Sequence, residues 1–207
     1  MMIAIIDYDM GNSRSVEKAI EAVGGEPVVT NELSVIEDAD KIILPGVGAF
    51  SKAMENLESL KLVDVLKRQI LEYRKPLLGI CLGMQLLAKT SYEFQETAGL
   101  GLIDATVERF NQGLVVPHVG WNNITLKRDT PFFDRVKSGD DFYFVHSFYM
   151  KNNRLEDIAA TCDYGIEFTA AVGKDNIFAT QFHPEKSQEK GLNILTEFVH
   201  LAGKVNA

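Results

Sequence analysis

Cysteine is nearly absent from this sequence, with only Cys81 and Cys162 among 207 residues. Disulfide scaffolds are usually short, secreted and rich in cysteine, so a fold held together by disulfides is not expected. No signal-like apolar core opens the chain either, because Asp7 introduces a charge after only a few apolar residues. We therefore expect the protein to work in a reducing cytoplasm.

Long apolar runs and clusters of positive charge are also missing. No stretch approaches the ~20 apolar residues that a membrane helix needs. The formal net charge is −8, and no basic run could follow a phosphate backbone. The sequence therefore predicts neither a membrane nor a nucleic-acid partner. Because the two cysteines and four histidines are scattered singly, no metal site is expected.

The remaining composition is that of a folded domain. Hydrophobic residues make up 46% of the chain and charged residues 24%, as is ordinary for a globular protein. A chain of 207 residues buries about 70% of the surface that its unfolded form exposes. No linker, repeat or low-complexity segment interrupts it, so residues 1–207 are expected to form a single domain.

Short apolar runs alternate with helical periodicity in the first half of the chain. The runs predict strands at Ile3–Asp7, Pro27–Thr30, Lys41–Leu44 and Leu77–Ile80. A helical stripe is formed by Val16, Ala19, Ile20 and Val23. Asn12 is the expected cap of that helix and Gly24-Gly25 its end, and further helices are expected around Leu57–Tyr73 and from Cys81 through Lys89. This order implies right-handed crossovers and a parallel sheet covered on both faces.

The second half of the chain has a different pattern. Short strands are predicted at Thr106–Phe110, Ile124–Leu126, Phe142–His146, Ala159–Cys162, Phe168–Val172 and Ile177–Phe182. A last amphipathic helix has Leu192, Leu195, Val199 and Ala202 on one face. We therefore expect an α/β fold whose central, mostly parallel sheet is flanked by helices, with additional antiparallel strands in the C-terminal half. In such sheets the reacting groups gather beyond the carboxyl ends of the strands.

The most informative stretch surrounds Cys81. An apolar strand ends in Gly79-x-Cys81-x-Gly83, and a helix follows at once. So sharp a turn, called a nucleophile elbow, brings the backbone close to its neighbours, which glycine tolerates. The helix N-terminus favours the thiolate, which is the reactive form of cysteine. The amide N–H of Leu82 is expected to be free to stabilise an oxyanion.

A buried structural cysteine is the competing interpretation, because cysteine is among the most often buried residue types. The flanking glycines and the change from strand to helix favour a nucleophile at Cys81. Cys162, between Thr161 and Asp163, has neither feature, and we interpret it as structural.

A candidate base follows the last apolar run, in the sequence His183-Pro184-Glu185. Residues i and i+2 of an extended segment point to the same side, so His183 and Glu185 can face the same way. Pro184 favours an extended backbone at His183. A carboxylate beside an imidazole fixes its tautomer while the other ring nitrogen addresses the thiol. A surface histidine next to a turn proline is the alternative, and the upstream cysteine argues against it.

The other histidines are weaker candidates. His118 is expected in a loop bounded by proline and glycine, and His146 at a strand end, where both could bind a ligand. His200 is expected to be solvated on the last helix.

Taken together, these motifs resemble the class I (triad-type) glutamine amidotransferases, and within them the glutaminase subunits of imidazole glycerol phosphate synthase. The pattern includes Gly79–Gln85 and His183–Ser187. The finer matches are Ile5–Tyr8, Met10–Asn12, Pro45–Phe50, Pro117–Asn122 and Tyr143–Ser147. Because these motifs extend from residue 5 to residue 187, the resemblance covers nearly the whole chain.

The resemblance implies a role for each matching position. It implies a catalytic triad of Cys81, His183 and Glu185. It implies an oxyanion hole made by backbone groups of Leu82 and of Val47 or Gly48, the second donor becoming available after a peptide flip. It places bound glutamine against Gly46, Gln85, Glu93, His146 and Ser147. A carboxylate such as Glu93 suits the α-ammonium group of glutamine, although an ordinary surface glutamate is the alternative.

The resemblance also implies a partner subunit. The interface is expected at Asn12, His118, Trp121, Asn122 and Lys186, with core packing as the competing interpretation for Trp121. The partner would be a (β/α)₈ cyclase that uses ammonia to make imidazole glycerol phosphate and AICAR in histidine biosynthesis. No cofactor or metal is implied. The sequence departs from the family pattern at Asp9, Ser13 and Val119, where glycine, leucine and methionine are expected.

Three alternatives remain open at this point. A paralogous glutaminase could feed ammonia to a synthase that aminates a sugar nucleotide, which the departures at Asp9 and Ser13 motivate. A cysteine hydrolase of the same sheet type, peptidase-like or chaperone-like, would work without a partner. A non-catalytic binding subunit would not need the three triad residues.

Overall fold

An eight-stranded sheet runs through the computed structural model, which describes residues 1–110 and 113–201. The strand order is β2-β1-β3-β4-β14-β13-β12-β9. The strands are β1 (Met2–Ile6), β2 (Glu26–Thr30), β3 (Lys41–Leu44), β4 (Leu77–Ile80), β9 (Thr125–Leu126), β12 (Ile158–Asp163), β13 (Glu167–Lys174) and β14 (Ile177–Thr180). The five from β2 to β14 are parallel and the rest antiparallel. The sheet is therefore mostly parallel, as predicted.

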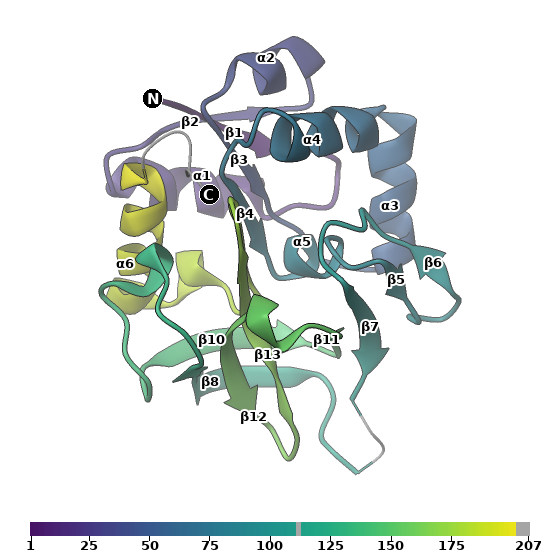
Figure 1. Cartoon of the computed structure of the whole chain (residues 1–207), viewed down its shortest axis with the longest axis vertical. Coiled ribbons are helices and arrows are strands. Elements are labelled where there is room, and N and C mark those ends of the chain that lie inside the picture. The colour runs from purple at the N-terminus through teal and green to yellow at the C-terminus, as the bar shows by residue number, and fades with distance from the viewer. Residues whose placement is uncertain (111–112, 202–207) are drawn as a thin grey trace.

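Two smaller sheets complete the fold. One pairs β8 (His118–Asn123) with β10 (Asp141–His146), and the other has the order β11-β7-β5-β6. The strands of the second are β5 (Thr90–Ser91), β6 (Thr97–Ala98), β7 (Ala105–Arg109) and β11 (Phe148–Asn152). Figure 1 shows the parallel part of the molecule above and the antiparallel strands β8 and β10 to β13 below it.

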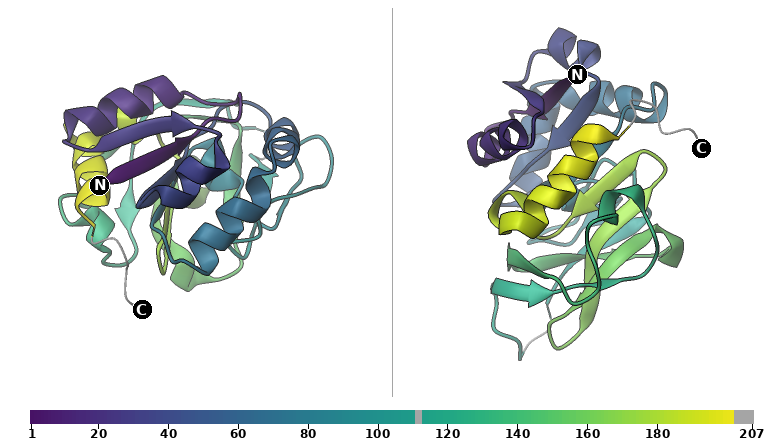
Figure 2. Two further views of the ribbon diagram at one scale, coloured as in Figure 1. Left: turned by 90° about the horizontal axis from the view of Figure 1, so that it is seen from above. Right: turned by 90° about the vertical axis from the view of Figure 1, so that its left-hand side faces the viewer.

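Helices cover both faces of the main sheet. They are α1 (Ser13–Ala22), α2 (Leu33–Asp38), α3 (Phe50–Ser59), α4 (Leu62–Leu71), α5 (Leu82–Gln85) and α6 (Gln188–His200), and the short 3₁₀ turns are Pro131–Phe133, Leu155–Asp157 and Pro184–Lys186. Helices α1 and α6 lie on one face (Figure 2), whereas α3 and α4 lie on the other (Figure 1). Two buried clusters correspond to these faces: one contains residues of α2, α3 and α4, and the other residues of α1 and α6.

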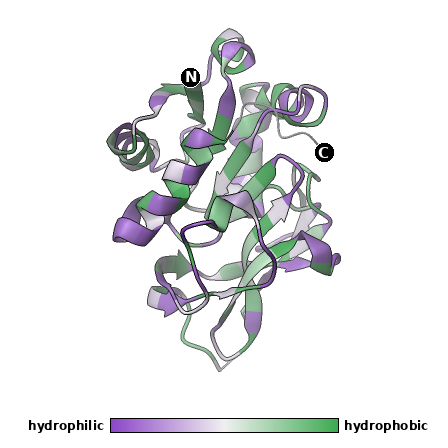
Figure 3. Cartoon of the chain, turned by 60° about the vertical axis from the view of Figure 1, so that its left-hand side comes forward, coloured by the Kyte–Doolittle hydropathy of each residue, from purple (hydrophilic) through white to green (hydrophobic). Residues whose placement is uncertain are grey.

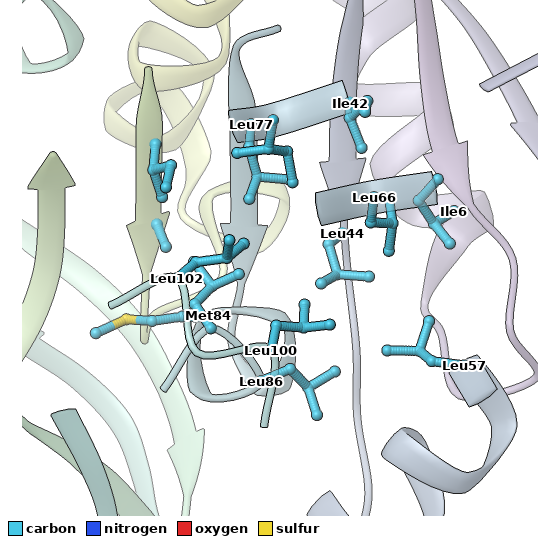
Figure 4. Close-up of a cluster of buried hydrophobic side chains, with 14 of the residues drawn as sticks. Ile6, Ile42, Leu44, Leu57, Leu66, Leu77, Met84, Leu86, Leu100 and Leu102 are labelled. Atoms are coloured by element: carbon cyan, nitrogen blue, oxygen red, sulfur yellow. The ribbon is translucent and has the colours of Figure 1, made fainter. Parts of the chain in front are cut away.

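The hydrophobic residues are concentrated between these layers. Central strands are mostly hydrophobic, and the peripheral helices carry many hydrophilic residues (Figure 3). In the first cluster, Leu57 of α3 and Leu66 of α4 pack with Ile42 and Leu44 of β3 (Figure 4). Each of these side chains is fully buried. This packing fixes β3 and β4 in place, and the candidate site lies at the end of those strands.

Most predicted elements are present with bounds that differ by one or two residues. All four strands predicted in the first half are found, and each segment predicted as a strand in the second half overlaps an observed strand. The last helix is also found, with Leu195 and Val199 buried and Leu192 partly buried. Ala202, predicted on the same face, lies outside the described residues.

Three local predictions were wrong. The helical region Leu57–Tyr73 is split between the two helices α3 and α4. Lys61, with a φ of 58°, lies between them and interrupts the helical backbone. The helix after Cys81 ends at Gln85 instead of continuing through Lys89. His118 belongs to β8 and not to a loop. That strand, His-Val-Gly-Trp-Asn-Asn, has few apolar residues and buries His118 in place of an apolar side chain.

Candidate active site

Cys81 occupies the turn between β4 and α5 in a conformation that L-residues rarely adopt. Its φ is 54° and its ψ −110°, so the backbone is strained there. A Cβ atom on Gly83 would lie 1.8 Å from the carbonyl oxygen of Leu44, so only glycine allows β3 to pass so closely. The predicted nucleophile elbow is therefore present in the structure.

His183 follows the strand next to that of Cys81, because β14 is the neighbour of β4. The two strands are parallel, with Thr180 opposite Ile80, and the amide of Cys81 donates to the carbonyl of Thr180 over 2.8 Å. The chain beyond Thr180 thus leaves the sheet at the same edge as Cys81. His183 is 1% exposed. Its Nε2 atom has no hydrogen-bond partner among the described residues.

Glu185 orients His183 by a geometry other than the predicted one. The Nδ1 atom of His183 lies 2.8 Å from Oε1 of Glu185, and both side chains are buried. Glu185 is not on an extended segment but in the 3₁₀ turn Pro184–Lys186. His183 itself is extended, and the turn begins directly after it. The turn brings the carboxylate of Glu185 to the imidazole ring, as the predicted extended segment would also have done.

Asn12 supports this carboxylate, whereas we predicted it as a helix cap. Its side-chain amide donates to Oε1 of Glu185 over 3.2 Å, and it makes no capping hydrogen bond to α1. The backbone of Asn12, with φ −88° and ψ 40°, is outside the extended region that N-cap residues usually adopt. Asn12 is therefore the N-cap residue of α1 by position, as predicted, but its side-chain amide contributes to the site instead of capping the helix.

The surroundings of His183 favour its charged form. Burial lowers the pKa of His183, but Cys81 and Glu185 together outweigh burial and raise the pKa to about 9. The imidazolium is thus stabilised by Cys81 and by the Glu185 carboxylate. Burial, with a smaller effect of Asp163, raises the pKa of Cys162 to about 12, so that thiol is unreactive near neutral pH. The two cysteines are both free.

A cavity of about 440 Å³ opens onto Cys81. Its described lining includes these residues predicted for the site: Val47, Gly48, Cys81, Leu82, Gln85, Glu93, His146 and Ser147. Gly46 and His183 are buried and do not line it. Glu93 is the only acidic and Arg109 the only permanently charged basic residue of the described lining.

The predicted oxyanion donors are engaged in other hydrogen bonds. The amide of Leu82, predicted to be free, donates to the carbonyl of Gly46 over 3.3 Å, and the amide of Val47 donates to Met10 over 2.8 Å. The Gly46–Val47 peptide unit therefore turns its oxygen toward the elbow. Gly48, with φ +100°, follows this unit. The prediction of a free Leu82 amide was wrong in this conformation.

Three predicted glutamine contacts also have internal partners. The amide of Gln85 donates to the Phe148 carbonyl and to Oε1 of Gln181, each over 2.9 Å. Glu93 accepts the amide of Phe50 at the start of α3 over 2.6 Å. Burial lowers the pKa of His146 to about 3, so this ring is neutral. Its Nδ1 atom lies 2.8 Å from the carbonyl oxygen of Phe148.

The residues predicted at a partner interface differ in exposure. Trp121 is 49% exposed and packs edge-on against Tyr143, so it is not a core residue. Lys186 is also exposed. His118 is 3% exposed, so little of its side chain is accessible to a partner in this conformation. Its ring stacks between Phe144 and Tyr164 and lies 3.0 Å from His146. Asn122 donates to the carbonyl of Asp163 over 2.9 Å.

Three further residues at the site were not singled out from the sequence. Gln181 is fully buried, with its amide nitrogen 3.7 Å from the sulfur of Cys81. Arg109 lines the cavity. The Tyr8 hydroxyl donates to the carbonyl of Pro45 over 2.6 Å; burial, and Cys81 to a lesser degree, raise the pKa of Tyr8. The one sequence signal for Gln181 as a site residue was its position two residues before His183.

Residues 1–110 and 113–201 do not meet the requirements of a metal site or of a membrane-spanning helix. There, no group of three or more His, Cys, Asp or Glu residues could hold a metal ion. No helix in the same part of the chain is long and apolar enough to cross a membrane.

A cysteine on a strand-to-helix elbow beside a buried His–Glu pair is the arrangement expected for a triad-type amidotransferase. The family model of the class-I glutamine amidotransferases matches residues 4–202. The fold is also similar to a chain of PurLQS from Thermotoga maritima, with a TM-score of 0.75 at 18% identity and 96% of each chain covered. A glutamine amidotransferase from the same organism has a TM-score of 0.66 at 20% identity, with 89% of this chain and 76% of that chain covered. The chain belongs to the class-I glutamine amidotransferase family.

Its relatives within that family are more specific. The chain is 54% identical over 203 residues to the imidazole glycerol phosphate synthase subunit HisH of Geobacter sulfurreducens, with 95% of this chain and 97% of the relative covered. It is 48% identical over 206 residues to the HisH subunit of Aquifex aeolicus, with 99% of each covered. At this identity and coverage, the chain is a member of the HisH branch of the family.

Proposed function

We propose that this chain is the glutaminase subunit of an imidazole glycerol phosphate synthase. It hydrolyses glutamine to glutamate and passes ammonia to a (β/α)₈ cyclase that makes imidazole glycerol phosphate and AICAR in histidine biosynthesis. One observation carries the proposal: Cys81 opens onto a cavity on one side and has the buried His183–Glu185 pair behind it. The HisH names of relatives about half identical in sequence favour this acceptor over a sugar nucleotide.

The proposed mechanism uses the triad in two half-reactions. The Cys81 thiol gives its proton to Nε2 of His183, and the thiolate attacks the side-chain amide carbon of glutamine. The imidazolium then protonates the departing nitrogen, so that ammonia leaves and a glutamyl thioester remains. His183 next takes a proton from water, and the hydroxide releases glutamate from the sulfur. Glu185 stays ionised and holds the ring in the required tautomer.

The oxyanion of each tetrahedral intermediate needs two backbone donors. We propose that rotation of the Gly46–Val47 peptide removes the Gly46 oxygen from the Leu82 amide, to which it is now hydrogen-bonded. The same rotation would turn the Val47 amide toward the cavity, with Gly48 as the flexible neighbour. Leu82 and Val47 would then hold the oxyanion, an interaction that contributes roughly 10²–10³ in rate for a single donor elsewhere.

Glutamine fits the charges of the cavity when its amide is directed toward Cys81. The α-ammonium group would then lie near Glu93 and the α-carboxylate near Arg109, the one acidic and one permanently basic side chain of the described lining. Among the described residues the Arg109 guanidinium has no hydrogen bond, so it is available to a carboxylate. Gln85, His146 and Ser147 would shape the walls, whereas Gly46, also predicted to contact glutamine, is buried and outside the described lining.

A docked partner follows from the chemistry of the product. Ammonia released into solvent would be lost, so the site needs a cover that accepts ammonia directly. We propose that the partner docks over Trp121, Asn122 and Lys186, with Asn12 at the edge of the interface, because Trp121 is a large exposed aromatic residue. Residues 1–207 would act as one domain in this complex. The free thiols of Cys81 and Cys162 are compatible with the cytoplasm.

The proposal can be tested with a glutamine analogue that carries an electrophilic carbon in place of the amide. We expect it to modify Cys81 alone, and excess glutamine to protect that residue. Cys162 in the same chain is the internal control, and Cys81→Ala should incorporate nothing. Modification that glutamine does not slow would contradict a glutamine site and favour a different cysteine hydrolase.

A further inference from the structure

Gln181 contacts the sulfur of Cys81 from the protein interior. Its amide nitrogen lies 3.7 Å from Sγ, within the range of an N–H···S hydrogen bond. The side chain is fully buried and comes from the segment between β14 and His183. The sulfur therefore has a polar neighbour besides the His–Glu pair.

The orientation of this amide is fixed by its neighbours. Oε1 of Gln181 accepts a hydrogen bond from Gln85 over 2.9 Å, so the NH₂ end of Gln181 must face the sulfur. Gln85 is itself held by the Phe148 carbonyl, which His146 also approaches at 2.8 Å. Reversing the Gln181 amide would place two donors against each other in a buried site, which is costly.

A second contact of the sulfur has the opposite character. Sγ lies 3.9 Å from the carbonyl oxygen of Val145, which can only accept a hydrogen bond and thus suits the thiol. The Gln181 amide can only donate at its nitrogen and thus suits the thiolate. The two contacts therefore match the two protonation states of the nucleophile.

We propose that Gln181 is a catalytic residue that donates a hydrogen bond to the Cys81 thiolate. When Sγ loses its proton to Nε2 of His183, the sulfur gains a negative charge and Gln181 keeps both of its protons. The contact strengthens at that moment because hydrogen bonds to charged groups are about twice as strong as neutral ones. This role deepens the proposed glutaminase function and rests on it.

The pH dependence of Cys81 alkylation tests this role in the full chain. Iodoacetamide would be used as the probe and the modified residue located by mass spectrometry. Gln181→Met removes the donor, and Gln181→Glu replaces it with an anion while keeping an acceptor for Gln85. We expect the midpoint of the alkylation profile to rise by about one pH unit in the Met variant and further in the Glu variant.

The control is Gln69→Met, which changes a buried glutamine of α4 that makes no contact with the sulfur; its midpoint should equal that of the unmodified chain. Unchanged midpoints in folded Gln181 variants, or equal shifts in all three variants, would overturn the proposal. If the Gln181 variants do not fold, NMR on the unmodified chain decides. The Gln181 side-chain amide signal should move with pH as Cys81 titrates and stay fixed in Cys81→Ala, and a signal that is flat in both contradicts the contact.

These readouts need no glutamine, so they separate the two claims. If the unmodified chain with its synthase partner releases no glutamate from glutamine, the proposed function fails whatever the alkylation profile shows. If it does release glutamate while the Gln181 readouts are flat, only the role of Gln181 fails.

Discussion

His183 lies between two groups that attract its proton, and its own burial opposes them. Removing either Cys81 or Glu185 should therefore lower the pKa of His183 strongly. The protonated ring stabilises the fold fully below the ordinary histidine pKa of about 6.5, and this contribution is lost as pH rises through about 9. A site-specific titration is preferable to a global stability curve, because other groups also titrate in that window.

We expect Glu185→Gln to lower the pKa of His183 from about 9 and to reduce glutamate release by roughly 10²-fold or more. The amide cannot stabilise the imidazolium or fix its tautomer as the carboxylate does. NMR titration of His183 gives the first value and a coupled glutamate assay the second. Glu189→Gln, which changes a surface carboxylate in the first turn of α6, should leave both unchanged; equal effects in the two variants would refute the pairing.

Arg109 is expected to act on substrate binding and not on chemistry. Arg109→Gln should raise KM for glutamine by about tenfold with little change in kcat, because the α-carboxylate loses a charge-assisted partner that it has in ground and transition states alike. The control is Arg74→Gln, on an arginine paired with Asp175 outside the cavity. A fall in kcat at constant KM would show that Arg109 has another role.

At the scale of secondary-structure elements, the site depends on three neighbouring parallel strands. The ends of β3, β4 and β14 deliver the Pro45–Gly48 segment, Cys81 and His183 to one edge of the sheet. Contacts from the neighbouring helices α5 and α6 then fix the position of β3. Two contacts at this scale can be tested separately from catalysis.

The first contact is the crossing of α5 over β3. Gly83→Ala should lower the free energy of unfolding by about 3 kcal/mol, because the new methyl group would overlap the Leu44 carbonyl, which is only 1.8 Å from the Cβ position. Chemical denaturation would measure the loss. Gly173→Ala, where the nearest atom is 3.6 Å away, serves as the control and should change stability little. A well-folded, fully active Gly83→Ala chain would mean that the elbow is not so tightly packed.

The second contact joins β3 to the end of α6. The buried ammonium of Lys41 donates to the carbonyls of Phe198 and Val199 over 2.7 and 2.5 Å, and burial lowers its pKa to about 8. Between about pH 8 and 10.5 the unfolded chain binds a proton that the folded chain does not, so this group makes stability rise with pH.

Lys41→Met should abolish that slope. The stability of the unmodified chain should rise relative to the variant as pH increases from 8 to 10.5, and the variant should also lose about 1–3 kcal/mol near neutral pH through its unpaired carbonyls. Urea titrations of both chains at several pH values would measure the difference. A difference that does not vary with pH would contradict a lowered pKa at Lys41.

The sequence predicted most helices and strands but few of the side-chain and backbone contacts at the site. Apolar runs marked β1, β3 and β4 because buried parallel strands are continuously hydrophobic. Strand β8 has an exposed tryptophan, a glycine and two asparagines, so its sequence carries no apolar alternation. The engaged amide of Leu82 could not be predicted, since it depends on one peptide orientation in a segment far away in the chain. The burial of His118 likewise depends on Tyr164, contributed by a distant hairpin.

For the molecule as a whole, the conformation of the site bears on how activity is controlled. The Gly46–Val47 peptide is hydrogen-bonded at both of its ends, and its oxygen engages the Leu82 amide that we propose as an oxyanion donor. Glutamine hydrolysis by the isolated chain should therefore be slow. A partner that binds over the exposed Trp121 would couple its own state to this peptide if it stabilised the rotated form, which is a coupling free energy between two sites.

The most direct test of the central claim is glutamate release from glutamine by this chain mixed with the cyclase of the same organism. It would be measured with and without the ribulosyl aminoimidazole carboxamide nucleotide that the cyclase uses, and Cys81→Ala would be the blank. We expect release that the nucleotide stimulates and that disappears in Cys81→Ala. Release no higher than this blank, from a cyclase that still works with ammonium salt, would contradict the pairing and make a sugar-nucleotide-aminating partner the next to test.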